Sequence, residues 1–193
     1  MKDLETSGRK TNRFMNIIVK PYGNELCYCR PDTTWERENK AFYSPECVNE
    51  VWYAPVVFAR IAKAGKCVGR KFAERYYDGI GCGILLYAND TLISYLDKSS
   101  ILPAPLYNPV VFDSRKEMQL NIGNESLGIT LEDIKERIEN TICDASRLIS
   151  LRIGDYIALE LKSLDLVARR QDGEKNIKGI FCEKEIFDFR LIF

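Results

Sequence analysis

The fold that we predict rests on residues 51–90, VWYAPVVFARIAKAGKCVGRKFAERYYDGIGCGILLYAND. The first part of this stretch, Val51 to Ile61, is rich in β-branched and aromatic residues, a composition typical of a buried strand. Between Arg70 and Asp78 apolar residues recur at helical spacing, which predicts an amphipathic helix. A second apolar strand, Ile84 to Ala88, is expected after three glycines that end this helix, Gly79, Gly81 and Gly83.

This text resembles the fumarylacetoacetate hydrolase family, in particular its short single-domain bacterial members. In those proteins the first strand reads like HYEVELVVRI, the helix like FAHRYYDEIGLGID and the next strand like FTARD. The corresponding text here is WYAPVVFARI, FAERYYDGIGCGIL and LYAND. Further similarities are RPD at 30–32, LRIGDYI at 151–157 and IFDFR at 186–190. The resemblance implies the family's mixed β-sandwich roll, a mainly β fold with α+β elements.

The resemblance is lost where the family keeps its chemistry. The family's two metal-binding glutamates fall on Ala54 and Val56, and its metal-binding aspartate falls on Leu85. Its active-site lysine falls on Val110. Residues two apart in a strand share a face, and a hard cation such as magnesium needs oxygen ligands, which these side chains lack. We therefore expect no catalytic, cofactor-binding or metal-binding residues at these positions, and no cofactor, where the family would use magnesium or manganese.

Two further family segments are missing. The loop that carries the family's active-site histidine is largely absent between the expected first strand, Phe14 to Val19, and Arg30, and the chain contains no histidine at all. Mechanisms that pair serine or cysteine with histidine are thereby excluded. The family's TGTP substrate segment is replaced by a strand that continues through 158–162. Pro55 lies between the two lost glutamates and forfeits a ladder hydrogen bond, so we also expect a remodelled backbone there.

Other elements follow from periodicity. The clearest helix is expected over Thr130 to Ser146, where an apolar stripe faces the sheet and Thr130 with Asp133 resembles a capping box. Asp172-Gly173 is expected to be a hairpin turn. The basic residues around that turn are interpreted as a solvated patch that serves solubility, and not as a phosphate-binding site. They are Arg169, Arg170 and Lys175.

Length and composition bound the remaining possibilities. A chain of 193 residues with 46% hydrophobic residues suits one domain, expected over 15–193, after a polar leader at 1–14 that we expect to be disordered. Lys plus Arg and Asp plus Glu number 28 each, so no nucleic-acid or anionic-membrane partner is indicated. No apolar run approaches the roughly 18–20 residues of a membrane span. The sequence indicates a cytoplasmic protein.

The seven cysteines are scattered, and an odd number in such a chain indicates reduced thiols. The only cluster is formed by Cys27, Cys29 and Cys47. A zinc site would need a fourth ligand, and no histidine can supply it. Buried or edge-strand thiols are the favoured interpretation, with a metal or redox role as the alternative.

The leading hypothesis is a non-catalytic member of the family, a pseudoenzyme that acts by association with itself or with an active paralogue. The family usually forms homodimers, which implies a homodimer or a heteromer here. One alternative is a divalent-metal-dependent hydrolase, hydratase or decarboxylase of a 2-oxo acid or β-diketone, with a site rebuilt from Asp113, Glu160, Asp78 or Tyr87. Another is a small-molecule binding protein that uses the old cleft.

Overall fold

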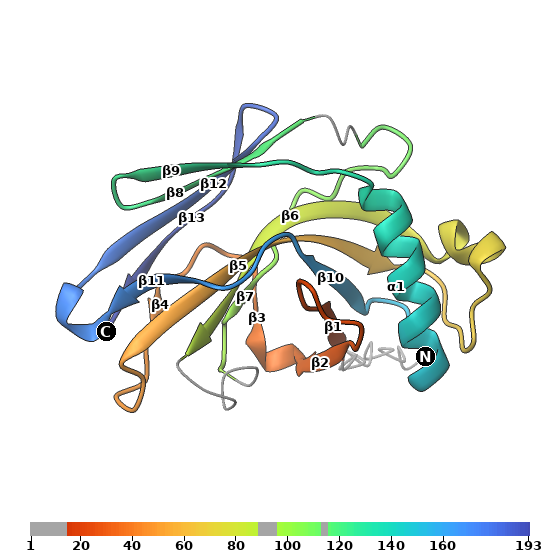
Figure 1. The fold of residues 1–193 in the computed structure, drawn as a ribbon, viewed down its shortest axis with the longest axis horizontal. Coiled ribbons are helices and arrows are strands. Elements are labelled where there is room, and N and C mark those ends of the chain that lie inside the picture. The colour runs from red at the N-terminus through yellow and green to blue at the C-terminus, as the bar shows by residue number, and fades with distance from the viewer. Residues whose placement is uncertain (1–14, 89–95, 113–115) are drawn as a thin grey trace, which may run out of the picture.

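The larger of two sheets forms the frame of the fold (Figure 1). This computed structural model describes residues 15–88, 96–112 and 116–193. The larger sheet has eight strands in the order β2-β1-β10-β5-β6-β7-β3, with β11 also paired to β5. The strands are β1 (Asn16–Lys20), β2 (Tyr28–Pro31), β3 (Trp35–Glu36), β5 (Glu50–Ile61), β6 (Tyr77–Ala88), β7 (Ser100–Ile101), β10 (Tyr156–Glu160) and β11 (Asp165–Arg169). The expected buried strand at 51–61 is confirmed as β5.

The smaller sheet has five strands in the order β4-β13-β12-β8-β9. These are β4 (Phe42–Tyr43), β8 (Met118–Ile122), β9 (Glu125–Ile129), β12 (Lys175–Phe181) and β13 (Lys184–Ile192). Within the described residues the helices are α1 (Ile134–Leu148) and three short 3-10 helices, η1 (Asp32–Thr34), η2 (Arg70–Tyr76) and η4 (Arg170–Asp172). Figure 1 shows the smaller sheet and α1 against the larger sheet. The predicted fold class, mainly β with α+β elements, is confirmed.

The larger sheet is buried on both faces, because successive residues of a strand point to opposite sides. On β5 the odd-numbered side chains, such as Val57 and Ala59, join a core shared with the smaller sheet and α1. The even-numbered ones, Ala54, Val56 and Phe58, join a second core on the other face. Burial on both faces explains why this strand reads as a continuous apolar run.

The prediction for Gly79, Gly81 and Gly83 is wrong. These glycines lie inside β6, which follows directly on η2, and η2 is a 3-10 helix. A Cβ atom on Gly81 would lie 2.5 Å from Cζ of Phe58, and one on Gly83 would lie 2.4 Å from the carbonyl oxygen of Ile101. The glycines therefore permit close packing within a strand.

Two other local predictions are corrected. Helix α1 begins at Ile134, and Asp133 before it has φ 51° and makes no side-chain capping bond, so the expected capping box at Thr130 does not form. Asp172-Gly173 connects β11 of the larger sheet to β12 of the smaller one, so it is no hairpin turn. The hairpin turn is Cys182-Glu183, between β12 and β13, where both residues have positive φ.

Pro55 marks a change of partner along β5. Its carbonyl accepts a hydrogen bond of 2.9 Å from the N–H of Leu161, and proline cannot donate one in return. β10 ends here, at the pair Val56–Glu160, and β11 takes over at the pair Tyr53–Asp165. The other edge of β5 stays paired with β6 from Val51 to Ile61, with a single register shift at its far end. The forfeited ladder bond thus falls between two partner strands.

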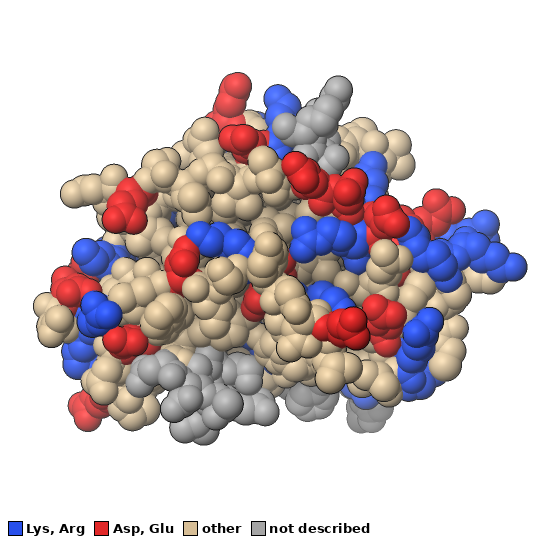
Figure 2. Space-filling view, in the orientation of Figure 1, with Lys and Arg blue, Asp and Glu red and all other residues tan. Residues whose placement is uncertain are grey.

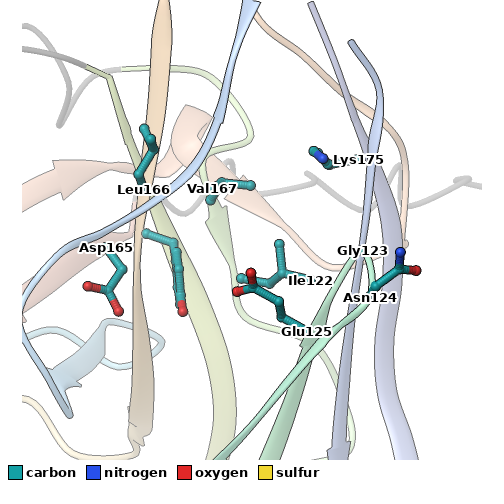
Figure 3. A pocket seen from close by; sticks show the side chains of 9 residues that line it. Ile122, Gly123, Asn124, Glu125, Asp165, Leu166, Val167 and Lys175 are labelled. Atoms are coloured by element: carbon teal, nitrogen blue, oxygen red, sulfur yellow. The ribbon is translucent and has the colours of Figure 1, made fainter. Parts of the chain in front are cut away.

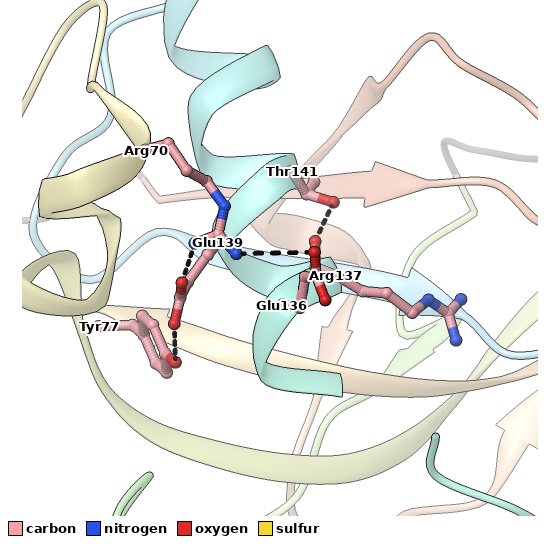
Figure 4. A network of polar contacts seen from close by, with 6 residues as sticks. All are labelled: Arg70, Tyr77, Glu136, Arg137, Glu139 and Thr141. Atoms are coloured by element: carbon pink, nitrogen blue, oxygen red, sulfur yellow. Dashed lines mark hydrogen bonds and ion pairs between the residues drawn. The ribbon is translucent and has the colours of Figure 1, made fainter. Parts of the chain in front are cut away.

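Polar contacts join α1 to η2 (Figure 4). The Arg70 guanidinium forms an ion pair with Glu139 on α1, and the Tyr77 hydroxyl donates to the same carboxylate at 3.4 Å. Burial, followed by the nearby Glu139 charge, raises the pKa of Tyr77 to about 12. These contacts connect α1 to the start of β6.

Charge is mixed over the surface drawn in Figure 2, where lysines and arginines lie among aspartates and glutamates. Among the described residues, no helix is long and apolar enough to span a membrane. The expected disordered leader, residues 1–14, lies outside the described residues.

Candidate former metal site

The three positions aligned with the family's metal ligands meet on one face of the larger sheet. Ala54 and Val56 are two residues apart on β5, and Ala54 lies directly opposite Leu85 on β6. Side chains in such positions share a face. All three are 0% exposed and belong to the second core. Their aliphatic side chains offer no oxygen ligand, so the residues at this place do not fit magnesium or manganese.

A buried carboxylate lies beside these positions. Glu160 on β10 is directly opposite Val56 and is 5% exposed. Its Oε1 accepts a hydrogen bond from the Tyr87 hydroxyl, and its Oε2 accepts one of 2.9 Å from the backbone N–H of Tyr22. Two of the four residues proposed for a rebuilt site, Glu160 and Tyr87, are therefore in contact. Both carboxylate oxygens already have a donor.

The contacts continue to a buried cation. The hydroxyls of Tyr28 and Tyr87 are 2.8 Å apart, and Nε of Arg30 donates to the Tyr28 hydroxyl at 3.4 Å. The only hydroxyl proton of Tyr87 goes to the carboxylate of Glu160, so Tyr28 must donate to Tyr87. A one-way chain of hydrogen bonds therefore runs from the Arg30 guanidinium to the Glu160 carboxylate.

Arg30 is 0% exposed, and each nitrogen of its guanidinium has at least one acceptor. Its guanidinium donates to the Leu86 carbonyl at 3.2 Å and to the hydroxyls of Ser99 at 3.2 Å and Ser100 at 3.3 Å. Its Cζ lies 4.3 Å from the centre of the Tyr87 ring. Buried charges persist only when their hydrogen bonds are satisfied, so this cluster is suited to hold β2, β6 and β10 together.

Burial raises the pKa of the Tyr87 phenol far above its ordinary value, although the Arg30 charge acts in the opposite direction. The phenol therefore stays protonated and acts as a hydrogen-bond donor. A phenol in this state is no general base near neutral pH.

The remaining predicted site residues lie elsewhere. Val110, at the position of the family's lysine, is 85% exposed. Asp78 forms an ion pair with Arg60 at 2.8 Å near the start of β6, whereas Leu85 and Tyr87 are near its other end. Asp113 lies outside the described residues. Of the four residues proposed for a rebuilt site, the structure therefore brings two together, Glu160 and Tyr87. The sequence did not predict that Arg30 is buried, because its RPD motif indicated only a similarity to a family strand.

All seven cysteines are free thiols. Cys82 and Cys143 are buried and Cys29 lies on the edge strand β2, as the favoured interpretation expects. Cys47 and Cys67 are exposed and lie outside the strands, so the favoured interpretation is wrong for these two cysteines. Within the described part of the chain, no three His, Cys, Asp or Glu side chains are grouped so that they could hold a metal ion.

Comparison with known proteins found no matching family model and no match among curated proteins. Solved structures do match. A fumarylpyruvate hydrolase from Pseudomonas aeruginosa in complex with Mn²⁺ and pyruvate superposes with a TM-score of 0.76 at 15% identity, over 94% of this chain and 90% of that one. A protein from Yersinia pestis CO92 assigned to the fumarylacetoacetate hydrolase family gives 0.75 at 16% identity, over 93% and 92%. The chain has the fumarylacetoacetate hydrolase fold.

This fold confirms the mixed β-sandwich roll that the sequence resemblance implied. A maleylpyruvate hydrolase from Sphingobium sp. SYK-6, also with manganese and pyruvate, matches at a TM-score of 0.71 and 17% identity, over 92% of this chain and 69% of that one. The structural neighbours are thus hydrolases and other proteins of the fumarylacetoacetate hydrolase fold. At these identities the likeness concerns the fold.

Proposed function

We propose that the chain is a non-catalytic member of the fumarylacetoacetate hydrolase family, built as one domain over residues 15–193. It acts by association with itself or with an active paralogue, in the bacterial cytoplasm. The observation that carries the proposal is that Ala54, Val56 and Leu85 meet on one face and are 0% exposed. Two neighbours of the same fold are complexes with Mn²⁺ and pyruvate. In this proposal the protein binds neither magnesium nor manganese and cleaves no carbon–carbon bond.

An exposed apolar surface supports the association. Leu26 and Leu148 are 69% and 67% exposed and line a cavity of about 410 Å³ between the β1–β2 connection and the end of α1. Charged residues of both signs surround them, namely Lys20, Glu25, Asp144 and Arg147. An apolar centre with a rim of mixed charge is the usual composition of a protein interface. In a two-fold dimer an acidic residue on the rim of one copy can face a basic residue on the rim of the other.

Light scattering of the purified chain tests the association. The wild type is expected to form a dimer, and Leu148→Glu is expected to shift it to monomer because the charge enters the apolar centre. Val110→Glu is the matched control, since Val110 is 85% exposed and lies outside the Leu26–Leu148 surface. A wild type that stays monomeric and that coprecipitates no enzyme of the family would contradict the proposal.

The contact between Glu160 and Tyr87 favours, as the second candidate, an enzyme with a rebuilt site. Its test is turnover of small acylpyruvates with added manganese. We expect no turnover, because both oxygens of Glu160 already accept hydrogen bonds.

The third alternative is a protein that binds an apolar ligand in the cleft of the family's active site, and it predicts that a small molecule copurifies. Because Ala54, Val56 and Leu85 are fully buried, we expect native mass spectrometry to detect the mass of the chain without a ligand.

A further inference from the structure

The segment that connects β5 to β6, residues 62–76, is basic although the whole chain is neutral. It contains five lysines and arginines but only one acidic residue, Glu74. The segment includes η2 and lies at one end of the molecule (Figure 1), where several lysines and arginines are close together in Figure 2. All five basic residues are exposed, namely Lys63, Lys66, Arg70, Lys71 and Arg75. The overall balance of 28 basic and 28 acidic residues conceals this local excess.

Two of these cations are engaged within the protein. Arg70 forms an ion pair with Glu139 on α1, and the Lys66 ammonium donates to the carbonyl oxygen of Leu148 at 2.7 Å. Ala73, on the inner side of η2, is buried. The segment is therefore fixed to α1 and to the core, and the side chains on its outer side are held in place before any partner binds.

The other three cations lie against aromatic rings. Lys71 Nζ lies 4.9 Å and Arg75 Cζ 5.7 Å from the centre of the Phe72 ring. Lys63 Nζ lies 5.3 Å from the centre of the Tyr76 ring. In the part of the chain that the structure describes, none of the three forms an ion pair. Phe72 itself is 43% exposed, so an apolar ring protrudes among cations that lack an acidic partner.

This combination suits a surface that is anionic outside and apolar beneath. Lysine and arginine can place their charges among lipid phosphates, while their alkyl stems and a neighbouring aromatic ring lie deeper, at the boundary with the acyl chains. Stacking of a nucleobase on Phe72 is less favoured, because two cations already lie over its ring. The position of the segment at one end of the molecule also suits contact with a flat surface (Figure 1).

We propose that Lys63, Lys71, Phe72 and Arg75 form a contact site for anionic phospholipids, through which the protein binds reversibly to a membrane surface. The lipid phosphates accept hydrogen bonds from the three cations, and Phe72 enters the apolar boundary below the headgroups. The cytoplasmic leaflet carries anionic lipids, so this site is compatible with a cytoplasmic protein. It is a different surface from the proposed dimer contact, and it stands whether or not the chain is catalytic.

Cosedimentation of the full chain with lipid vesicles tests the proposal. The wild type is expected to bind vesicles of phosphatidylcholine with about 30% phosphatidylglycerol, with half-saturation below about 5 mM lipid, because each cation near an anionic surface strengthens binding about fivefold. Binding to pure phosphatidylcholine is expected to be at least about tenfold weaker, since this attraction is lost. Raising the salt from about 0.1 M to about 0.5 M is expected to release the protein, because salt screens surface charges.

Variants locate the site. The double variant Lys71→Glu/Arg75→Glu is expected to weaken the binding at least about tenfold, and Phe72→Ser at least about threefold. These three positions are exposed, so the variants keep the fold. The matched controls keep the wild-type affinity, and they are Lys116→Glu/Lys184→Glu and Tyr43→Ser, at exposed positions outside residues 62–76.

Three results overturn the proposal: no binding to the anionic vesicles, equal binding to pure phosphatidylcholine, or unchanged binding in Lys71→Glu/Arg75→Glu. A fourth concerns nucleic acid. If a labelled polyuridine of about 20 nucleotides binds more tightly than the vesicles and loses its affinity in the same double variant, the segment is a single-strand binding site and the proposal is wrong.

Discussion

Arg30 and Glu160 are two buried charged side chains beside the positions aligned with the family's metal ligands, and the hydroxyls of Tyr28 and Tyr87 connect them. Removing one member of such a cluster leaves another member buried and unpaired, which costs more than removing the whole cluster. The cluster therefore stabilises the native arrangement of β2, β6 and β10.

Tyr87→Phe tests this role. The variant removes the donor to Oε1 of Glu160 and the acceptor for Tyr28, so the free energy of unfolding is expected to fall by about 1–3 kcal/mol. Urea denaturation followed by circular dichroism measures it. Tyr43→Phe, at a side chain that is 71% exposed, is the control and should stay within about 0.5 kcal/mol of the wild type. An equally small change in Tyr87→Phe would refute the role.

Tyr77 makes the free energy of unfolding depend on pH in the alkaline range. An unfolded phenol ionises near pH 10, whereas the native Tyr77 keeps its proton to about 12. Between these values the native state binds more protons, so stability is full below pH 10 and falls as the pH rises, by about 1.4 kcal/mol per pH unit for this residue. Tyr77→Phe is expected to lose stability less steeply between pH 10 and 11.5, in urea titrations. Equal slopes in both proteins would contradict the account.

At the scale of elements, the β12–β13 hairpin turns through Cys182-Glu183, with φ values of 51° and 62°. Two-residue hairpin turns of this kind favour Asn-Gly, because both central residues have positive φ. The present residues therefore hold a conformation that L side chains rarely adopt.

Glu183→Gly is expected to raise the free energy of unfolding by about 0.5–1 kcal/mol, since the relief of positive φ exceeds the added entropy of the unfolded chain. Thermal and urea unfolding measure the change. Glu183→Ala removes the same side chain but keeps the strain, so it should give no such gain. A stabilisation that is equal in both variants would show that the side chain, and not the backbone, is the cause.

Across the fold, the sequence predicts those features that depend on apolar patterning and on family resemblance. It predicted β5 and the mainly β class. That Ala54 lies opposite Leu85 follows from the β5–β6 register. The sequence could not predict the role of Gly81 and Gly83, because a close approach to Phe58 and Ile101 depends on tertiary neighbours. The burial of Arg30 could not be predicted for the same reason, since its acceptors come from residues distant in sequence.

The same contrast holds for turns and surfaces. Asp172-Gly173 has the local composition of a hairpin turn, yet the strands on either side of it belong to different sheets. Lys175 is predicted to belong to a solvated basic patch, and in the fold it lines a cavity of about 470 Å³ together with Tyr53 and Glu125 (Figure 3). Local residue types predict local conformation, whereas the pairing of distant strands decides which side chains meet.

In the proposed function, the positions of the family's metal ligands have become core and hold no metal. Calorimetric titration with magnesium and manganese, alongside a thermal-unfolding scan, tests this, because a metal that binds only the native state raises the melting temperature by mass action. We expect heats equal to those of dilution and an unchanged melting temperature. Saturable binding of one metal per chain, with a raised melting temperature, would overturn the proposed function and would indicate a metal site rebuilt around Glu160.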